Sequence, residues 1–172
     1  MRHPSTFLLS AFLTVSLPAL ILVGCASKSE RDARRAEGSY ELGELPDWER
    51  IKDPGGADYA WVKTSSGAVI FADSNCGPRY SDSKLEDLLD KQIAGLREGE
   101  PLQSERLTLS DREALQTRHL GRLDGVPVEL GTTVLKKHFC TYDVVLIAPR
   151  GLAFDQAWAD YVSAVDDFRT TL

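Results

Sequence analysis

The sequence predicts an α+β domain: a mostly antiparallel β-sheet with packed helices, including a long amphipathic helix near the C-terminus. Three observations support this class. Short apolar runs separated by turn residues predict several strands between residues 59 and 148. The pair Asp124-Gly125 predicts a two-residue hairpin, which joins antiparallel strands. From Phe154 to Phe168, apolar residues recur every three or four positions, as one buried face of a helix requires.

The first elements of the domain are predicted from their apolar patterns and turn residues. Two strands are expected at 59–62 and 68–72, with a turn at 64–67 in which a glycine can take a positive φ. Tyr59 and Trp61 alternate along the first strand with Ala60 and Val62. The two aromatic side chains therefore point to one face, and Ala60 and Val62 point to the other. An exposed apolar face on this strand would mark a partner surface.

A helix is predicted after these strands. Ser83 and Glu86 have the spacing of a capping box, and apolar residues follow one helical stripe from there to Leu96. Gly99 and Pro101 are expected to close this segment.

The later strands are predicted by alternating or continuous apolar runs. They are expected at 105–109, 114–123, 126–135 and 139–148. Pro127 indicates that the first residues of its strand lie at a sheet edge, because proline cannot donate to the ladder. Residues 144–148 are continuously apolar, so this run is expected to be the central strand, covered on both faces.

The N-terminal segment has the features of a secretory signal. Arg2 and His3 form a basic start, and an apolar run follows to Gly24. The tetrad Leu22-Val23-Gly24-Cys25 resembles the bacterial lipoprotein lipobox. The resemblance implies cleavage between Gly24 and Cys25, a lipid thioether on the cysteine sulfur, and acylation of the new amino terminus, for example by palmitate. More than one chain is needed for stable anchoring, which this modification supplies.

The predicted organisation has three parts: a signal peptide at 1–24, a mobile tether at 25–44 and a single domain at 45–172. Residue 26 is Ala rather than Asp, which in lipoproteins of two-membrane bacteria implies the outer membrane, with the domain facing the periplasm. The alternative is an uncleaved transmembrane anchor, since the apolar run is just long enough to span a bilayer. Pro18 and several hydroxyl residues in the run weaken that alternative.

Net charge excludes some classes of partner. The chain of 172 residues carries −6, and removal of residues 1–24 would make this −7, because Arg2 is the only charged side chain lost. Nucleic acid is not expected as a partner, since phosphate binding depends on clustered Lys and Arg. Broad electrostatic adhesion to anionic headgroups is not expected either. The expected partners are membrane lipid, through acylated Cys25, and an unidentified envelope protein.

If Cys25 is lipidated, Cys76 and Cys140 remain. In an exported domain such a pair commonly forms a disulfide, which we predict here; the alternative is two separate buried thiols. A structural zinc site is not expected, because the chain has only three histidines and one lies in the predicted signal.

The C-terminal half resembles the end of PsbP-like domains. The resemblance rests on the Asp-Gly hairpin, the strand from Tyr142 to Ala148, the break at Pro149 and the helix from Phe154 to Phe168. It implies an α/β/α sandwich around an antiparallel sheet, such as occurs in a photosystem subunit, a Ran-binding import factor and envelope lipoproteins of the DcrB type. It also implies an accessory or binding protein without a shared enzymatic activity.

No known catalytic motif is present. We expect no catalytic residues, no bound metal and no cofactor. Ser110 lies in a polar turn, and a lone His119 with Asp124 is a weak basis for acid–base chemistry. Asp160, Asp166 and Asp167 do not converge on a helix, so a solvated face is the better interpretation.

Three functions follow from these patterns. The favoured one is a non-enzymatic accessory or interaction module, lipid-anchored in the bacterial envelope. The second is a carrier of a small apolar ligand between sheet and helix, suggested by the aromatic stripe of the last helix. The third is a hydrolase with a site around His119 or Ser110.

Overall fold

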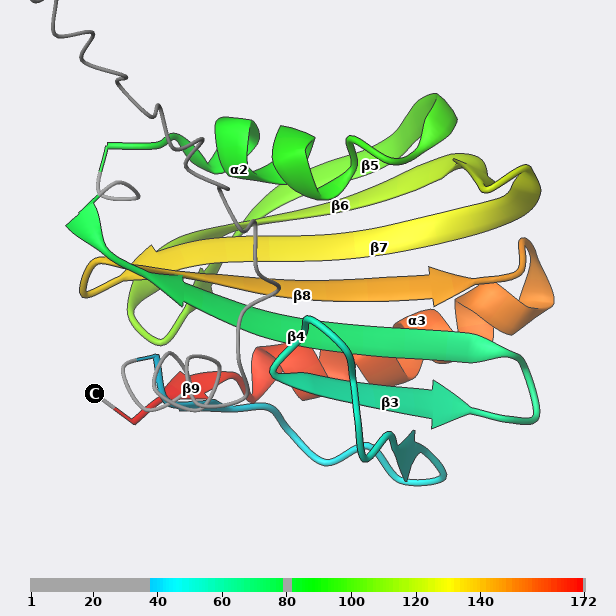
Figure 1. The fold of residues 1–172 in the computed structure, drawn as a ribbon, viewed down its shortest axis with the longest axis horizontal. Helices are drawn as coiled ribbons and strands as arrows, with labels where there is room; N and C mark the ends of the chain where they lie inside the picture. The colour runs from blue at the N-terminus through cyan, green and yellow to red at the C-terminus, as the bar shows by residue number, and fades with distance from the viewer. Residues whose placement is uncertain (1–37, 79–81, 172) are drawn as a thin grey trace, which may run out of the picture.

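The structure is a computed structural model that describes residues 38–78 and 82–171. In this part of the chain a seven-stranded sheet carries a helix on each face, and a small two-stranded sheet lies beside it (Figure 1). The order across the large sheet is β2-β3-β4-β8-β7-β6-β5, and each neighbouring pair is antiparallel. The predicted α+β class is therefore confirmed.

The elements have the following bounds. The large sheet contains β2 (Glu49–Arg50), β3 (Tyr59–Lys63), β4 (Ala68–Cys76), β5 (Arg97–Leu109), β6 (Arg112–Leu123), β7 (Val126–Lys137) and β8 (Cys140–Ala148). The small sheet pairs β1 (Tyr40–Glu41) with β9 (Arg169–Thr170), and the helices are α2 (Leu85–Gln92) and α3 (Leu152–Asp166). The continuously apolar strand, β8, lies at the centre of the large sheet, as predicted.

The aromatic stripe of α3 packs on one face of the sheet. In Figure 1, β4 passes in front of this helix. Phe154 and Tyr161 are fully buried, and the Tyr161 hydroxyl is 2.6 Å from Thr133 Oγ1 and donates to the Val144 carbonyl over 2.9 Å. Trp158 lies directly over Gly131 of β7, where a Cβ would be 2.3 Å from its ring. The stripe is therefore core, and the observation that suggested an apolar-ligand carrier is explained by packing.

The second helix, α2, packs on the opposite face. Its buried leucines, together with Ile93 just after the helix, form a separate apolar cluster with Leu115 of β6 and Val134 of β7. Leu96, four residues beyond the helix end, packs against Gly121 of β6, where a Cβ would be 2.3 Å from its side chain. The two faces of the sheet thus hold two distinct cores.

The predicted start of this helix is wrong in one respect. Ser83 and Glu86 do not form a capping box, and no side chain caps the helix at Lys84. The Glu86 carboxylate instead binds Arg106 of β5. The helix also ends at Gln92, several residues before the predicted limit.

The strand β5 begins earlier than predicted and contains Gly99 and Pro101, which were expected to close the preceding segment. Two irregularities interrupt its pairing with β6, one before Glu100 and one after Pro101. Because β5 is an edge strand, it tolerates both irregularities. The proline nitrogen cannot donate a hydrogen bond, but in the described part of the chain no strand lies on the outer side of β5 to accept one.

The predicted boundary at residue 45 is also wrong. Tyr40 lies in β1, pairs with Thr170 and is 4% exposed. Its ring centroid is 5.5 Å from that of Tyr142 and 5.7 Å from that of Phe168. Apolar burial therefore holds this segment in the folded domain. The predicted signal peptide and lipidation site lie outside the described residues.

Both predictions about the start of β7 are confirmed. Asp124 and Gly125 form the expected turn with φ values of 48° and 81°. Pro127 pairs with Arg122 of β6, whereas the ladder with β8 begins only at Glu129. The first residues of β7 therefore extend past their other neighbour, which leaves the proline nitrogen on an unpaired edge.

Candidate functional site

A pocket of about 290 Å³ opens between the N-terminal segment and β3. We call it the aromatic pocket; it is lined by Tyr40, Glu41, Leu42, Arg50, Tyr59 and Trp61. Its volume is close to the lower limit for small-ligand sites, and it combines three aromatic rings with one guanidinium and one carboxylate.

The rings of the aromatic pocket contact one another. The centroids of Tyr40 and Tyr59 are 5.5 Å apart in an edge-to-face arrangement, and those of Tyr59 and Trp61 are 5.9 Å apart. The Arg50 guanidinium carbon lies 4.8 Å from the Tyr59 ring centroid. Such contacts are favourable for ring pairs and for a cation over a ring, so they hold the walls in place before any ligand arrives.

The alternation along β3 brings its two rings to this pocket. Tyr59 pairs with Ala72 and Trp61 with Ile70, both on the α3 side of the sheet. Both rings remain half-buried, whereas Ala60 on the other face is fully buried. The sequence predicted that Tyr59 and Trp61 share one face of β3. The structure shows that this face borders the aromatic pocket.

The other wall is the N-terminal segment, which is fastened to α3. The Gly43 amide donates to the Ala164 carbonyl over 2.9 Å, and a Cβ on Gly43 would lie 2.8 Å from the Asp167 Cβ. Further along, Trp48 Nε1 donates to Asp160 Oδ2 over 2.9 Å. Only glycine permits the approach at position 43, so this segment takes one path across the helix.

Tyr40 and Arg50 are pocket residues that sequence reasoning missed. Tyr40 was assigned to the tether. It is the only aromatic residue between Cys25 and Glu44, and a lone aromatic residue in a polar segment could have indicated that this part of the segment is buried. Arg50 carried no such signal, because its role depends on a two-residue strand that pairs it with Trp61.

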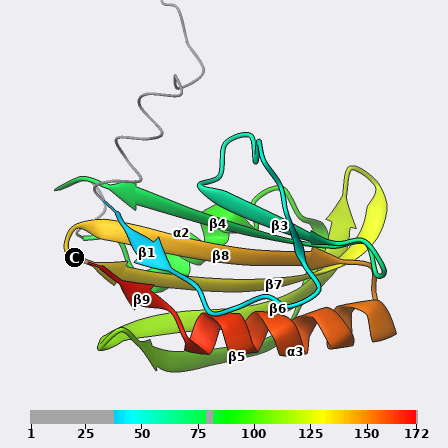
Figure 2. The same cartoon turned by 90° about the horizontal axis from the view of Figure 1, so that it is seen from below.

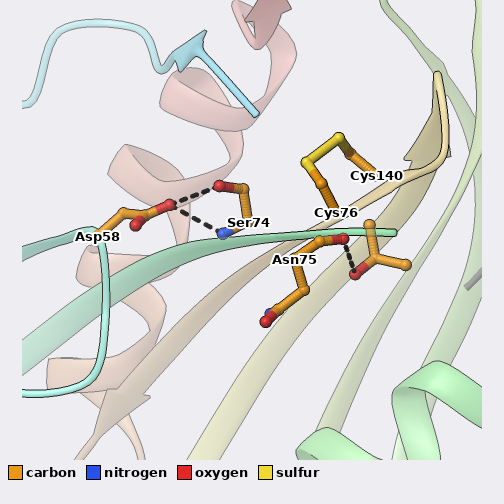
Figure 3. Close-up of a disulfide and its surroundings, with 6 residues drawn as sticks. Asp58, Ser74, Asn75, Cys76 and Cys140 are labelled. Carbon is orange, nitrogen blue, oxygen red and sulfur yellow. Dashed lines mark hydrogen bonds between the residues drawn. A yellow bond between two sulfur atoms is a disulfide. The ribbon is translucent and has the colours of Figure 1, made fainter. Parts of the chain in front are cut away.

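A second hollow of about 400 Å³ shares Arg50 with the aromatic pocket. Lys52 and Asp58 also line it. Asp58 is already engaged: its Oδ2 accepts hydrogen bonds from the Ser74 amide at 2.9 Å and the Ser74 hydroxyl at 2.7 Å (Figure 3). This carboxylate therefore ties the loop before β3 to β4, and Arg50 lies at the border of both hollows.

The lining of the aromatic pocket has the composition of a binding site. Its described lining residues include no Ser, Cys or His, and the groups that can transfer a proton are the Glu41 carboxyl and the tyrosine hydroxyls. Aromatic walls bind an apolar or aromatic group, and the guanidinium can pair with a carboxylate on the same group.

The structure gives Ser110 a structural role. It lies in the turn between β5 and β6. Its hydroxyl donates a hydrogen bond to the Phe168 carbonyl over 3.2 Å and accepts one from the Thr170 amide over 3.1 Å. These two bonds tie the turn to β9. The Ser110 hydroxyl is therefore engaged in hydrogen bonds that stabilise the fold. Ser110 lies at the opposite end of β6 from the turn that contains Asp124.

His119 lies in the middle of β6 and is buried. Burial lowers its pKa, and the nearby Asp90 carboxylate opposes this shift. Asp124 is in the exposed turn between β6 and β7. The structure thus does not bring His119 together with Ser110.

The aspartates of α3 do not form a cation site. Asp160 binds Lys63 and Trp48, and Asp167 is 3.8 Å from Arg169. Within the described ranges, no group of three or more His, Cys, Asp or Glu side chains is arranged to hold a metal ion.

The predicted disulfide is present. Cys76 at the end of β4 and Cys140 at the start of β8 are bonded with an S–S distance of 2.00 Å, and Figure 3 shows the link between the two neighbouring strands. Gly24 and Cys25, the predicted cleavage and lipidation residues, lie outside the described residues. In the described part of the chain, neither helix has the length and apolar character needed to cross a bilayer.

Comparison with solved structures identifies the fold. The chain resembles LpqN of Mycobacterium tuberculosis, described as involved in cell envelope biogenesis, with a TM-score of 0.58 and 14% identity over 78% of this chain and 86% of that one. It also resembles the Ran-binding protein Mog1p of Saccharomyces cerevisiae, with a TM-score of 0.56 and 9% identity over 77% and 90%.

A third similar structure is cyanobacterial PsbP (CyanoP) from Synechocystis sp. PCC 6803, with a TM-score of 0.53 and 13% identity over 76% and 86%. No family model matches the chain, and no curated protein matches it by sequence. At these identities the likeness shows the fold alone, and that fold is PsbP-like, as the sequence resemblance implied.

Proposed function

We propose that the chain is a lipid-anchored lipoprotein of a bacterial envelope whose domain is a non-enzymatic interaction module. The aromatic pocket is the observation that carries this proposal. It is a hollow with ring walls and charged groups at its rim, and its described lining residues include no Ser, Cys or His.

The address rests on the sequence. Cys25 ends a lipobox-like tetrad and precedes Ala26, which favours the outer membrane and a domain facing the periplasm. The Cys76–Cys140 disulfide is consistent with an oxidising compartment. The involvement of LpqN in cell envelope biogenesis is compatible with the same setting.

The composition of the aromatic pocket favours a protein partner. Trp, Tyr and Arg are the residues that most often dominate binding energy at protein interfaces. A hollow of this size accommodates one large side chain of the partner, and Arg50 and Glu41 at the rim provide charged groups to orient it. The partner is therefore an envelope protein that presents an aromatic or aliphatic anchor beside a carboxylate.

The test is site-specific photo-cross-linking in intact cells. A photoreactive residue replaces Glu41 of β1 at the pocket rim, and a matched control replaces Asp124, which is also exposed but lies in the β6–β7 turn at the other end of the sheet (Figure 2). We expect a reproducible protein product from position 41 only. No product, or the same products from both positions, would contradict the proposal.

A substitution separates recognition from folding. Arg50→Glu reverses the charge at the rim, where the side chain is exposed, so it should abolish the cross-link from a photoreactive residue at Glu41. Its thermal unfolding should match the wild type within about 2–4 °C, as for most surface substitutions. A variant that folds normally and still cross-links equally well would exclude the pocket as the binding site.

A further inference from the structure

The turn between β7 and β8 exposes an aromatic side chain. Lys137 pairs with Cys140, so His138 and Phe139 form a two-residue loop. Both loop residues have positive φ, 52° and 65°. Phe139 is 70% exposed, more than Val126 at the tip of the β6–β7 hairpin, which is 60% exposed. We call the segment 136–139 the aromatic tip.

The residues of the aromatic tip are unfavourable for their backbone conformation. Two-residue hairpins of this kind prefer Asn, Asp or Gly, because bulky side chains are disfavoured at positive φ. The β6–β7 turn follows this preference with Asp124-Gly125. A phenylalanine that is strained and exposed contributes little to the fold. Local strain of this kind points to a function outside the domain.

The aromatic tip is held rigidly. The Phe139 carbonyl accepts from the Gly77 amide over 2.9 Å, and the next residue, Cys140, is in the disulfide with Cys76. Lys137 Nζ donates to the Ser110 carbonyl over 3.0 Å, and Lys136 Nζ donates to the Ser83 carbonyl. The backbone of the aromatic tip is therefore held in place, and two lysines directly precede its loop at the end of β7.

The described chain begins beside this tip. A Cβ on Gly38 would lie 2.8 Å from Ser74 Cβ and 3.1 Å from Cys76 Sγ, so Gly38 lies against the end of β4. In Figure 1 the end of β4 and the β7–β8 turn lie at one end of the sheet, and the β6–β7 turn lies at the other. Figure 2 shows β1 at the same end as the β7–β8 turn.

The proposed anchor limits how far this end of the domain can lie from the membrane. Residues 26–37 join Cys25 to Gly38, and even a fully extended chain of that length spans about 45 Å at most. An acylated Cys25 would therefore restrict the distance between the bilayer and the end of the domain that carries the aromatic tip.

We propose that the aromatic tip contacts the membrane in which Cys25 is anchored, with Phe139 inserted among the headgroups. This inference rests on the proposed lipid anchor. Aromatic rings favour the interface between headgroups and acyl chains, and lysines next to them are attracted to anionic lipid. The whole chain carries −6, so this attraction is local to the tip. The contact fixes the orientation of the domain and turns the β6–β7 end away from the bilayer.

The test measures depth in the membrane with the full-length protein reconstituted in anionic vesicles. Phe139→Trp places a tryptophan at the tip, and Val126→Trp is the matched control at the opposite end. Brominated acyl chains quench tryptophan emission on contact, and the wild-type protein gives the background from its three tryptophans. We expect at least about a twofold loss of the added emission for F139W and none for V126W, because an interfacial side chain reaches the acyl boundary.

The outcomes separate the tip from the anchor. Flotation of the wild type and of Cys25→Ser, with intact mass, shows whether Cys25 is the anchor. If the wild type is acylated and floats while F139W is quenched no more than V126W, the tip proposal is wrong and the anchor stands. If the wild type is not acylated, the same variants are added to vesicles as soluble proteins. If the added tryptophan at position 139 is not quenched in that experiment, the proposal is also overturned. This is the result expected if Phe139 binds a protein and not lipid.

Discussion

The indole of Trp48 and the carboxylate of Asp160 meet across 112 residues of sequence: Trp48 Nε1 donates to Asp160 Oδ2 over 2.9 Å. The same oxygen accepts from Lys63 Nζ at 2.7 Å. One carboxylate on α3 thus links the N-terminal segment to the end of β3, the two parts of the chain that enclose the aromatic pocket.

Replacement of Asp160 should therefore destabilise the domain. Asp160→Ala leaves the indole N–H of the buried Trp48 and the Lys63 ammonium without their shared acceptor, which should lower the free energy of unfolding by about 1–3 kcal/mol. Asp160→Asn keeps an acceptor for Trp48 and should cost less. Chemical denaturation measures both. Asp166→Ala, on the exposed side of the same helix, is the control and should be near neutral. Equal effects of D160A and D166A would contradict the linking role.

Packing of α3 against β7 depends on a glycine. Gly131→Ala would place a Cβ about 2.3 Å from the Trp158 ring, so the helix or the ring must move. Overpacking of this kind should destabilise the domain by about 1–3 kcal/mol. Gly56→Ala is the control, because a Cβ there meets nothing within 4 Å. Thermal unfolding of the two variants checks this; a G131A protein as stable as G56A would show that the contact is not tight.

The disulfide should contribute substantially to stability. Cys76 and Cys140 are separated by 64 residues, and a loop of that length corresponds to about 4 kcal/mol in the chain-entropy model. The Cys76→Ala, Cys140→Ala double variant should lose this amount in urea unfolding. Reductant should destabilise the wild type and leave the double variant unchanged. If reductant shifts neither protein, the bond does not stabilise the fold.

Asp143 should make stability depend on pH. Burial is the main cause that raises its pKa from 3.8 to about 7, the Asp73 carboxylate adds to the shift, and a hydrogen bond from Gln92 opposes it. Between pH 4 and pH 7 the folded carboxyl stays protonated while the unfolded one is ionised. Unfolding then releases a proton, so this group's contribution to stability falls as pH rises to about 7 and is constant above.

The variant Asp143→Asn isolates this contribution. It cannot ionise, so its stability relative to the wild type should rise between pH 5 and pH 7 and then level off. The buried His119 acts in the opposite direction, losing stability as pH falls below about 6.5, but it is present in both proteins and cancels in the difference. Urea midpoints at pH 5, 6, 7 and 8 give the curve; a difference that is flat with pH would contradict the raised pKa.

Periodicity and turn residues were sufficient to predict most of the fold. The three/four spacing of α3 identified its buried face, and Asp124-Gly125 identified a hairpin, because both signals are local. The short strand β1 was missed, since two residues carry no periodicity and the rings that bury Tyr40 belong to distant residues, Tyr59, Tyr142 and Phe168. The capping box predicted at the start of α2 is absent, and Glu86 is instead paired with Arg106, a contact that the local sequence does not reveal.

The candidate site was only partly predictable for the same reason. Alternation identified Tyr59 and Trp61 as a face of β3, but which face borders a pocket depends on where the N-terminal segment crosses α3. Asp160 was interpreted as part of a solvated helix face, because nothing in the local sequence reveals that Trp48 and Lys63 meet it. Long-range contacts of this kind determine the pocket.

The proposal that this is an exported, lipid-anchored envelope protein can be decided by the intact mass of the protein purified from its native membrane. The sample is alkylated with and without prior reduction. We predict a mass that lacks residues 1–24 and carries acyl chains on Cys25, with Cys76 and Cys140 alkylated only after reduction. A full-length, unacylated mass with both cysteines alkylated before reduction would contradict the account.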